Sequence, residues 1–564
     1  MPLRMHRTIT MGAGAPNQFP GRPIVIRGGT LIDGTGREPI KHAVVVVEGE
    51  KIKAVGTQGE VPVPPRSDVI DARRKTLLPG LIDGHGHLED FVGEIYLHLG
   101  VTTCPDIQAM RDEYWSMAQR DGTNMGLIRG PRIWSAGRAI GAGPDMTATG
   151  GGRNARGTLS WVKTPEEARE AVRQKQQLGL DQLKIMDYLP MDAVKAACEE
   201  GRRFGLHATC HTYDVCASAE AGVSGVEHFW SVGFTSIADV NRRQKLVDDR
   251  YASRIDSEEM PYYYEPESFD RIIEVMVTNN VSWSPTVATW FRPLSPSAER
   301  FRKRELSILN QAKYLPTVVG GVTLGQYDRV KRFPADKLDR IKRGYEKIED
   351  FIRRYVRAGG IIRAGSDPSH GMPGLLVHEE MTMLVEAGLT PMQAIQSATI
   401  NVAKLFGKDK DFGTVQPGKT ADIIAVDGDP LKDIWSTQNV KMVLLSGKLM
   451  DIRFSAAYKN PIPSPDPWRL IPSRIEVSPR SIPQGSKSTV VSVKPATGRV
   501  APWHQVAFDG TLLATRFVNS TELQATVPPR AFKRAGLKWV TVVSPRESGG
   551  SSQPEYVIVS FKKK

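Results

Sequence analysis

The feature that most constrains the fold is an alternation of short apolar strands with helical stretches between Gly80 and about Ser397. Eight apolar segments recur there, each followed by enough chain for a crossover: GLIDGHGH, GVTTCPDI, GPRIWSAG, DQLKIM, GLHATCH, GVSGVEH, NVSWSPTV and GGIIRAGSD. Parallel strands joined by helical crossovers close into a (β/α)₈ barrel. The sequence therefore predicts an α/β fold with a TIM barrel over residues 80–409.

Strand patterns of another kind flank this region. Residues 22–79 hold short Val/Ile runs between Gly-rich turns, and residues 410–453 return to that pattern. Because a small sheet needs several strands to bury a face, we expect the two segments to form one composite β-sandwich. Residues 1–21 show neither pattern nor the apolar core of a signal peptide, and are predicted to be disordered.

The last part of the chain reads as a separate all-β domain. A proline-rich linker is predicted at residues 454–472, followed by short strands and turns over residues 473–564. The turn spacing, the FDG motif and the TELQATVP strand resemble an IPT/TIG immunoglobulin-like domain. Such modules commonly bind partners or act as spacers, and many occur on exported proteins.

Composition excludes some partners and leaves localisation open. The net charge of +13 is spread along the chain, which favours solvated helix faces over nucleic-acid binding. No apolar run is long enough to predict a membrane span, and the four cysteines lack the pairing of a metal site or a disulfide framework. We expect a soluble protein without nucleic-acid partners; a homo-oligomer remains open.

Polar residues capable of binding metal fall at the ends of five of the predicted strands. His85 and His87 lie two residues apart, so their side chains share one face at about 6.6 Å along a strand. The other strand ends carry Lys184, His211, His228 and Asp367. Since the C-terminal ends of barrel strands meet at the catalytic face, and the chain has only eleven histidines, this pattern predicts a metal site.

The fifth strand offers a second histidine. Gly205 is a plausible end for the preceding helix, and a barrel strand needs about five residues to cross before its terminal ligand. His211 fits that distance, whereas His207 lies at the opposite end and is expected to be structural.

Together the motifs resemble the amidohydrolase superfamily, in its imidazolonepropionase-like and Xaa-Pro dipeptidase-like branch. The likeness runs from about Ile24 to Asp451 and rests on segments such as LLPGLIDGHGH, LKIM, AGVSGVEH, AGSD and FGTVQPGKTADIIAVDGDPL. It implies a binuclear divalent metal centre, usually zinc. By this resemblance His85, His87 and Asp367 would hold one ion, His211 and His228 the other, and Lys184, carboxylated by carbon dioxide, would bridge them.

Such a centre implies hydrolysis of a C–N bond. Two ions would lower the pKa of a shared water to give a bridging hydroxide, and Asp367 would carry its proton to the leaving amine. The expected substrate is a small amide, a Xaa-Pro-like dipeptide or an N-acyl amino acid. A cyclic amide or lactone hydrolase, or a deaminase, would use the same ligands, and a non-catalytic binding scaffold is the alternative from another class.

Several positions depart from the branch and bear on the substrate. Pro105 stands where relatives often have an arginine, and Arg153 stands near the position of a histidine. Tyr213 and His370 are predicted substrate contacts because they follow strand ends, and Arg153 is a third because it stands near the histidine position of the relatives. The charged, tyrosine-rich segment 235–271 is expected to be either a lid or an exposed insertion.

Overall fold

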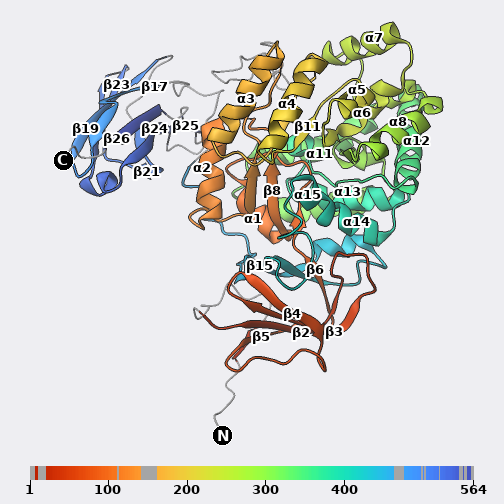
Figure 1. The fold of residues 1–564 in the computed structure, drawn as a ribbon, viewed down its shortest axis with the longest axis horizontal. Coiled ribbons are helices and arrows are strands. Elements are labelled where there is room, and N and C mark those ends of the chain that lie inside the picture. The colour runs from red at the N-terminus through yellow and green to blue at the C-terminus, as the bar shows by residue number, and fades with distance from the viewer. Residues whose placement is uncertain are drawn as a thin grey trace. The chain divides into compact units, whose positions relative to one another are not determined.

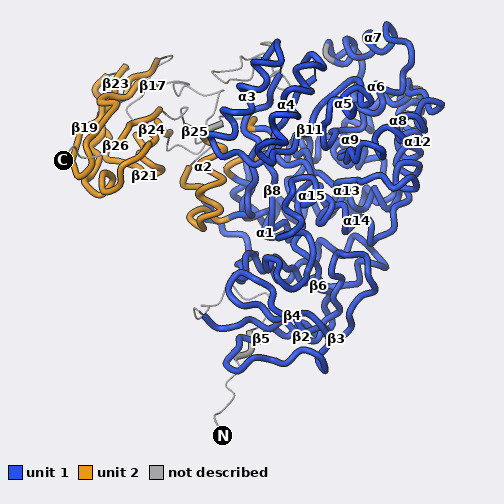
Figure 2. The backbone as a smooth tube through the Cα atoms, in the orientation of Figure 1, with its two compact units in different colours: residues 1–87, 91–108, 130–458 blue, residues 88–90, 109–129, 459–564 orange. Residues whose placement is uncertain are grey.

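The computed structural model describes residues 7–9, 21–110, 113–141, 162–187, 189–462, 475–496, 500, 504–519, 521–544, 550–551 and 555–560. The chain divides into two compact units (Figure 2): one comprises residues 1–87, 91–108 and 130–458, and the other residues 88–90, 109–129 and 459–564. The second unit thus takes up two short segments from within the predicted barrel region. The predicted domain boundaries remain a prediction.

The two flanking segments of the first unit join in one nine-stranded sheet. Strand β14 (Ile423–Asp427) pairs antiparallel with β6 (Lys75–Pro79), and β15 (Val440–Leu445) pairs with β14. The other strands are β1 (Arg7–Ile9), β2 (Ile24–Leu31), β3 (Ile40–Glu48), β4 (Lys51–Thr57), β5 (Asp68–Asp71) and β16 (Lys448–Leu449). Apolar side chains alternate along β2 and β3, so the strands contribute to two separate apolar clusters. One cluster includes Ile26 and Val45, and the other includes Val25 and Val44.

Part of the N-terminal segment forms a strand. Arg7–Ile9 lie inside the segment predicted to be disordered, yet they form β1 and pair parallel with β5. The exposed edge of β5 supplies hydrogen-bonding groups that a three-residue strand with Thr and Ile can use, and such a short pattern is too weak to detect in the sequence.

The central region is an α/β arrangement of short parallel strands. One sheet runs β7 (Leu81–Ile82), β8 (Val101–Asp106) and β9 (Arg132–Ser135). A second runs β10 (Leu183–Ile185), β11 (Ala208–Cys210), β12 (Gly225–Glu227) and β13 (Ser282–Ser284). Backbone hydrogen bonds link the sheets: Asp181 N donates to Ser135 O at 2.9 Å, Arg363 N to Trp283 O at 2.8 Å, and Asp367 N to His85 O at 2.8 Å.

Helices surround these strands (Figure 1). Those of the first unit are α1 (Val92–His98), α3 (Pro165–Gln177), α4 (Met191–Arg203), α5 (Val215–Glu220), α6 (His228–Ser236), α7 (Val240–Tyr251), α8 (Phe269–Thr278), α9 (Val287–Phe291), α10 (Ala298–Gln311), α11 (Thr317–Lys331), α12 (Ala335–Arg357), α13 (Leu375–Glu386), α14 (Pro391–Ser397) and α15 (Ile400–Leu405). Local sequence explains the start of α3, which begins at a capping box of Thr164 and Glu167 with Pro165 at its first position. No helix in the described part of the chain could span a membrane.

The second unit contains α2 (Glu113–Asn124) and two sheets. One sheet has the order β17 (Ile475–Ser478), β19 (Thr489–Pro495), β23 (Glu522–Val527) and β22 (Thr515–Asn519). The other holds β18 (Ser481–Pro483), β26 (Glu555–Ser560), β24 (Gly536–Ser544), β20 (Gln505–Phe508), β21 (Thr511–Leu512) and β25 (Gly550–Ser551). Alternate residues such as Val491, Val493, Val540 and Val542 build one shared core. The predicted all-β domain is present; its IPT/TIG identity stays a prediction.

A buried histidine of the fold predicts how stability depends on pH. His378 on α13 contacts Thr437 and the Leu99 carbonyl, and burial lowers its pKa from 6.5 to about 4. As pH falls from about 6.5 to about 4, the unfolded chain gains a proton that folded His378 does not, so up to about 3 kcal/mol of stability is lost. In urea unfolding at several pH values, the free energy of unfolding should fall less steeply with decreasing pH for His378→Gln than for wild type. An equal pH dependence in the two proteins would contradict this.

Candidate metal centre

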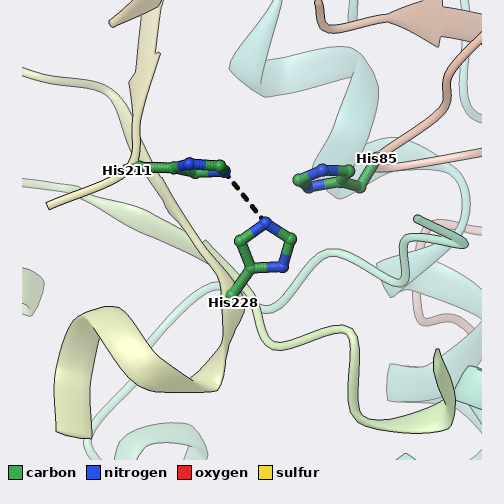
Figure 3. A group of neighbouring side chains, drawn as sticks. All are labelled: His85, His211 and His228. Atoms are coloured by element: carbon green, nitrogen blue, oxygen red, sulfur yellow. Dashed lines mark hydrogen bonds between the residues drawn. The ribbon is translucent and has the colours of Figure 1, made fainter. Parts of the chain in front are cut away.

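Residues at neighbouring strand ends converge at one place in the first unit. His85 follows β7, Lys184 lies in β10, His211 follows β11 and His228 follows β12. Figure 3 shows the rings of His85, His211 and His228 directed toward one another, with His211 Nε2 at 2.9 Å from His228 Nε2. These three can offer ligand atoms that lie within 4.8 Å of one another. The arrangement suits one cation held by imidazole nitrogens.

A second group of candidate ligand atoms shares His85. His85, His87 and Asp367 also offer atoms within 4.8 Å of one another, and His87 Nε2 lies 3.8 Å from Asp367 Oδ1. His87 Nδ1 lies 3.1 Å from the Gln108 carbonyl oxygen, which leaves Nε2 to face Asp367. The structure thus brings together five of the six predicted ligands in two overlapping groups.

Lys184, the sixth predicted ligand, is buried in the same region. Its side chain is fully buried, and its Nζ has no hydrogen-bond partner among the described residues. Burial lowers the pKa of this amine, although the charge of Glu227 opposes the shift. A buried lysine without a partner is unfavourable as a structural group, so this position fits a lysine that reacts or binds a ligand.

His85, His211 and His228 lie where burial favours the neutral form that metal binding requires. Burial is the main cause of the lowered pKa of His85, and it also places the pKa values of His211 and His228 well below the usual range. The positive charges of Lys184 and, for His211 and His228, of Arg250 act in the same direction. Each ring can therefore donate a nitrogen lone pair at neutral pH.

A buried ion pair orients His85. Its Nδ1 lies 2.7 Å from Glu227 Oε2, and Glu227 Oε1 accepts a hydrogen bond from Arg363 at 3.0 Å. Burial raises the pKa of Glu227, but Arg363, His85 and Lys184 outweigh it and hold that pKa well below its usual value. A carboxylate on Nδ1 leaves Nε2 of the imidazole for a metal ion.

Sequence reasoning missed this pair. Glu227 directly precedes His228, and Arg363 interrupts the apolar strand IIRAG, so charged residues within two buried strands were the available signal. Arg363 also donates to the Gly84 carbonyl and to Ser282, which connects the end of β12 with β13 and with the residues that follow β7.

The backbone is strained around the centre. His228, Thr286 and Asp367 adopt left-handed φ values of 63°, 53° and 34°, which are uncommon outside glycine and rare for a β-branched residue such as Thr286. Such strain concentrates at functional sites, where surrounding contacts enforce it. Here the His228 Nδ1 and Thr286 Oγ1 lie 2.8 Å apart, so two of the strained residues support each other.

An aromatic and cationic stack lies beside His228. The Trp230 ring packs on the His228 ring at a centroid distance of 3.8 Å and an angle of 23°. The guanidinium carbon of Arg250 lies 4.2 Å from the centroid of the Trp230 ring. Arg250 belongs to α7, within the 235–271 segment, so this segment reaches the centre through Trp230.

The predicted substrate contacts have different outcomes. Tyr213 is partly exposed, with its ring 5.4 Å from that of Phe234, and His370 lies 4.3 Å from Trp290. Arg153 lies outside the described residues. His207 directly precedes β11, where its Nδ1 lies 3.4 Å from Ser224 Oγ. His211 follows β11, and it is this histidine that contacts His228.

The ion pair of Glu227 yields a prediction about stability. Glu227→Gln keeps the shape of the side chain, but its single amide oxygen cannot accept hydrogen bonds from both Arg363 and His85. The positive charge of the buried Arg363 is then left without its carboxylate partner. We expect the free energy of unfolding to fall by about 3–5 kcal/mol, measured by urea denaturation. Glu166→Gln, at a carboxylate whose side chain is 80% exposed, should change it by less than about 0.5 kcal/mol. Equal values for both variants would contradict the proposed role.

Part of the chain is similar in sequence to known proteins. The amidohydrolase family model matches residues 191–450. Ochratoxinase of Aspergillus niger is 23% identical over 476 residues, which cover 74% of this chain and 84% of that enzyme.

Solved structures share the fold. A Xaa-Pro dipeptidase with methionine bound in its active site superposes with a TM-score of 0.55 and 22% identity, covering 76% of this chain and 100% of the dipeptidase. Molinate hydrolase superposes with a TM-score of 0.55 and 21% identity, covering 77% of this chain and 96% of that enzyme.

Proposed function

We infer that this chain is a member of the amidohydrolase superfamily and uses two divalent metal ions to hydrolyse a C–N bond of a small amide, a Xaa-Pro-like dipeptide or an N-acyl amino acid. The observation that carries the proposal is the convergence of two histidine-containing ligand groups beside a buried lysine without a described hydrogen-bond partner. Zinc suits a set of this kind, made of imidazoles and a carboxylate.

The donor set fits two ions. We propose that His87 and Asp367 hold one ion and His211 and His228 the other, with His85 Nε2 available at the junction of both groups. We assign His85 to the ion of His87 and Asp367. Lys184, carboxylated by carbon dioxide, would supply an oxygen to each ion, which would give its buried amine the partners that it lacks. The carbamate also removes the positive charge that would repel both cations.

The residues divide the chemistry between them. Bound ions would act as Lewis acids and lower the pKa of a coordinated water. Asp367, whose Oδ1 accepts a hydrogen bond from Ser369 at 3.1 Å, is placed to take the proton of the attacking water and return it to the leaving nitrogen. Glu227 holds the orientation of His85, and Thr286 that of His228. Tyr213 and His370 are proposed to contact the substrate.

The proposed site lies at one end of a proposed barrel. We propose that the two parallel sheets and segment 361–367 form the (β/α)₈ barrel, because backbone hydrogen bonds join their edges through Asp181, Arg363 and Asp367. A closed barrel directs the C-terminal ends of its strands to one mouth, and the candidate ligands follow or lie in those strands.

A substrate panel tests the proposed reaction. Full-length protein loaded with zinc should release a free amino acid from at least one Xaa-Pro dipeptide or N-acyl amino acid, followed by liquid chromatography of the products. A chelator should abolish the release and zinc should restore it. Ring opening of cyclic amides or release of ammonia, with all open-chain substrates intact, would overturn the proposed substrate class in favour of the alternatives on the same ligands.

A further inference from the structure

We propose that the 235–271 segment is a brace that positions His228, and with it one of the two metal ions, through helix α6. This inference rests on the proposed function, because it assigns a role toward the ion of His211 and His228. The brace acts through Arg250 and Tyr264, which contact α6 and are not among the proposed metal ligands, so both are positioning residues.

The brace is firmly attached to the helices that follow it in the chain. Glu259 pairs with Arg340 of α12 at 2.7 Å, Asp256 pairs with Lys337, and the almost fully buried Glu258 pairs with Arg329 of α11. Lys347 of α12 donates to the Tyr264 carbonyl at 2.9 Å. Partly buried pairs that form a network resist separation more than isolated surface pairs do. These contacts argue against both a mobile lid and a loosely exposed insertion.

Close backbone approach fixes the short stretch between α12 and α6. A Cβ on Gly344 of α12 would lie 2.6 Å from the Tyr262 nitrogen, and one on Gly233 of α6 would lie 1.9 Å from Cζ of Tyr264. Glycine at both positions lets residues 260–264 pack directly against the two helices. At the end of α6, the Glu265 nitrogen donates to Ser236 Oγ at 3.0 Å. The stretch therefore holds α6 along its length.

His228 is the first residue of the helix that is held in this way. Its left-handed φ of 63° must be enforced by its surroundings, and its ring packs on Trp230 two residues later. Arg250 from the brace lies over the Trp230 ring at 4.2 Å, where a cation is attracted by the indole face. The order Arg250, Trp230, His228 is thus a continuous stack from the brace to a candidate ligand. His87, by contrast, lies 3.1 Å from the Gln108 carbonyl oxygen and 3.8 Å from Asp367.

The test separates the two ions. Metal-free full-length protein is titrated with zinc against a chromophoric chelator, for wild type, Arg250→Met, Arg250→Lys and the control Arg254→Met. Arg254 lies in the same segment but is 61% exposed and pairs with Asp249. We expect Arg250→Met to weaken the binding of one of the two zinc ions by about 10- to 100-fold, as substitutions of residues that orient a metal ligand do. The affinity for the other ion should be unchanged. Arg250→Lys keeps the cation on the ring and should retain most of the affinity.

A second pair of variants checks the contact through Tyr264. Gly233→Ala forces α6 or Tyr264 to shift and should weaken the binding of the same zinc ion. Gly325→Ala on α11 is the control, because a Cβ there would meet open space, and it should leave both affinities unchanged. Two unchanged affinities in Arg250→Met, or equal weakening of both ions, would overturn the brace. A wild-type chain that binds fewer than two zinc ions would overturn the proposed function first, and the brace with it.

Discussion

Lys184→Ala is expected to abolish turnover and to leave the protein unable to hold two metal ions together. In the proposed centre this lysine supplies both bridging oxygens, and the fully buried amine has no described hydrogen-bond partner to replace that role. Turnover and zinc content per chain, measured on wild type and variant prepared in parallel, should fall together. The loss should exceed about 1,000-fold in kcat, since both the nucleophile and the carbonyl polarisation depend on the ions.

The missing group can be supplied from outside. Removing the Lys184 side chain leaves space where a small carboxylate, such as formate, acetate or propionate, could take the place of the carbamate. Part of the activity should return with one of these acids. Lys175→Met is the matched control, because Lys175 is also buried but donates to the carbonyls of Ala136 and Arg138. Full activity in Lys184→Ala would contradict the bridge, and rescue of Lys175→Met by the same acids would show that the rescue is not specific.

Asp367→Asn should lower kcat by about 100- to 10,000-fold while the fold is kept. Asparagine preserves the size of the side chain and an oxygen ligand, but it cannot accept and return a proton. Single-turnover measurements with a substrate from the panel give the rate of the chemical step directly. Circular dichroism checks that the fold is retained.

The control for Asp367 is Asp336→Asn on α12, where the carboxylate is 72% exposed and pairs with Arg340. It carries the same chemical change far from any candidate ligand in the sequence and should keep wild-type kinetics. An Asp367→Asn enzyme with an unchanged kcat would remove Asp367 from the proton transfer. His85→Ala should likewise abolish turnover without unfolding the chain, because His85 belongs to both ligand groups.

Much of the candidate site could be predicted from the sequence because it depends on where strands end. His85, His87, His211 and His228 follow apolar strands, and the ends of parallel strands meet in space whatever the loops do. The choice of His211 over His207 needed only the end of the preceding helix at Gly205 and the length of a strand. These predictions required only the order of the strands and helices along the chain and the spacing of apolar residues within them. Local sequence encodes both.

The remaining features depend on tertiary packing. Nothing near Glu227 in the sequence indicates that it meets Arg363, which lies 136 residues away. The attachment of the 235–271 segment rests on ion pairs with α11 and α12 and on the close approach at Gly233 and Gly344. Exposed and docked insertions have the same charged composition, so the sequence left both readings open.

The most direct test of the central claim is elemental analysis of the wild-type chain purified without chelator, with turnover measured on the same sample. The proposed centre predicts two divalent ions per chain, loss of turnover when a chelator removes them, and recovery with zinc in bicarbonate buffer. A chain that holds no ion, gains none on reconstitution with zinc, manganese or cobalt, and turns over no substrate would contradict the claim and favour a binding scaffold.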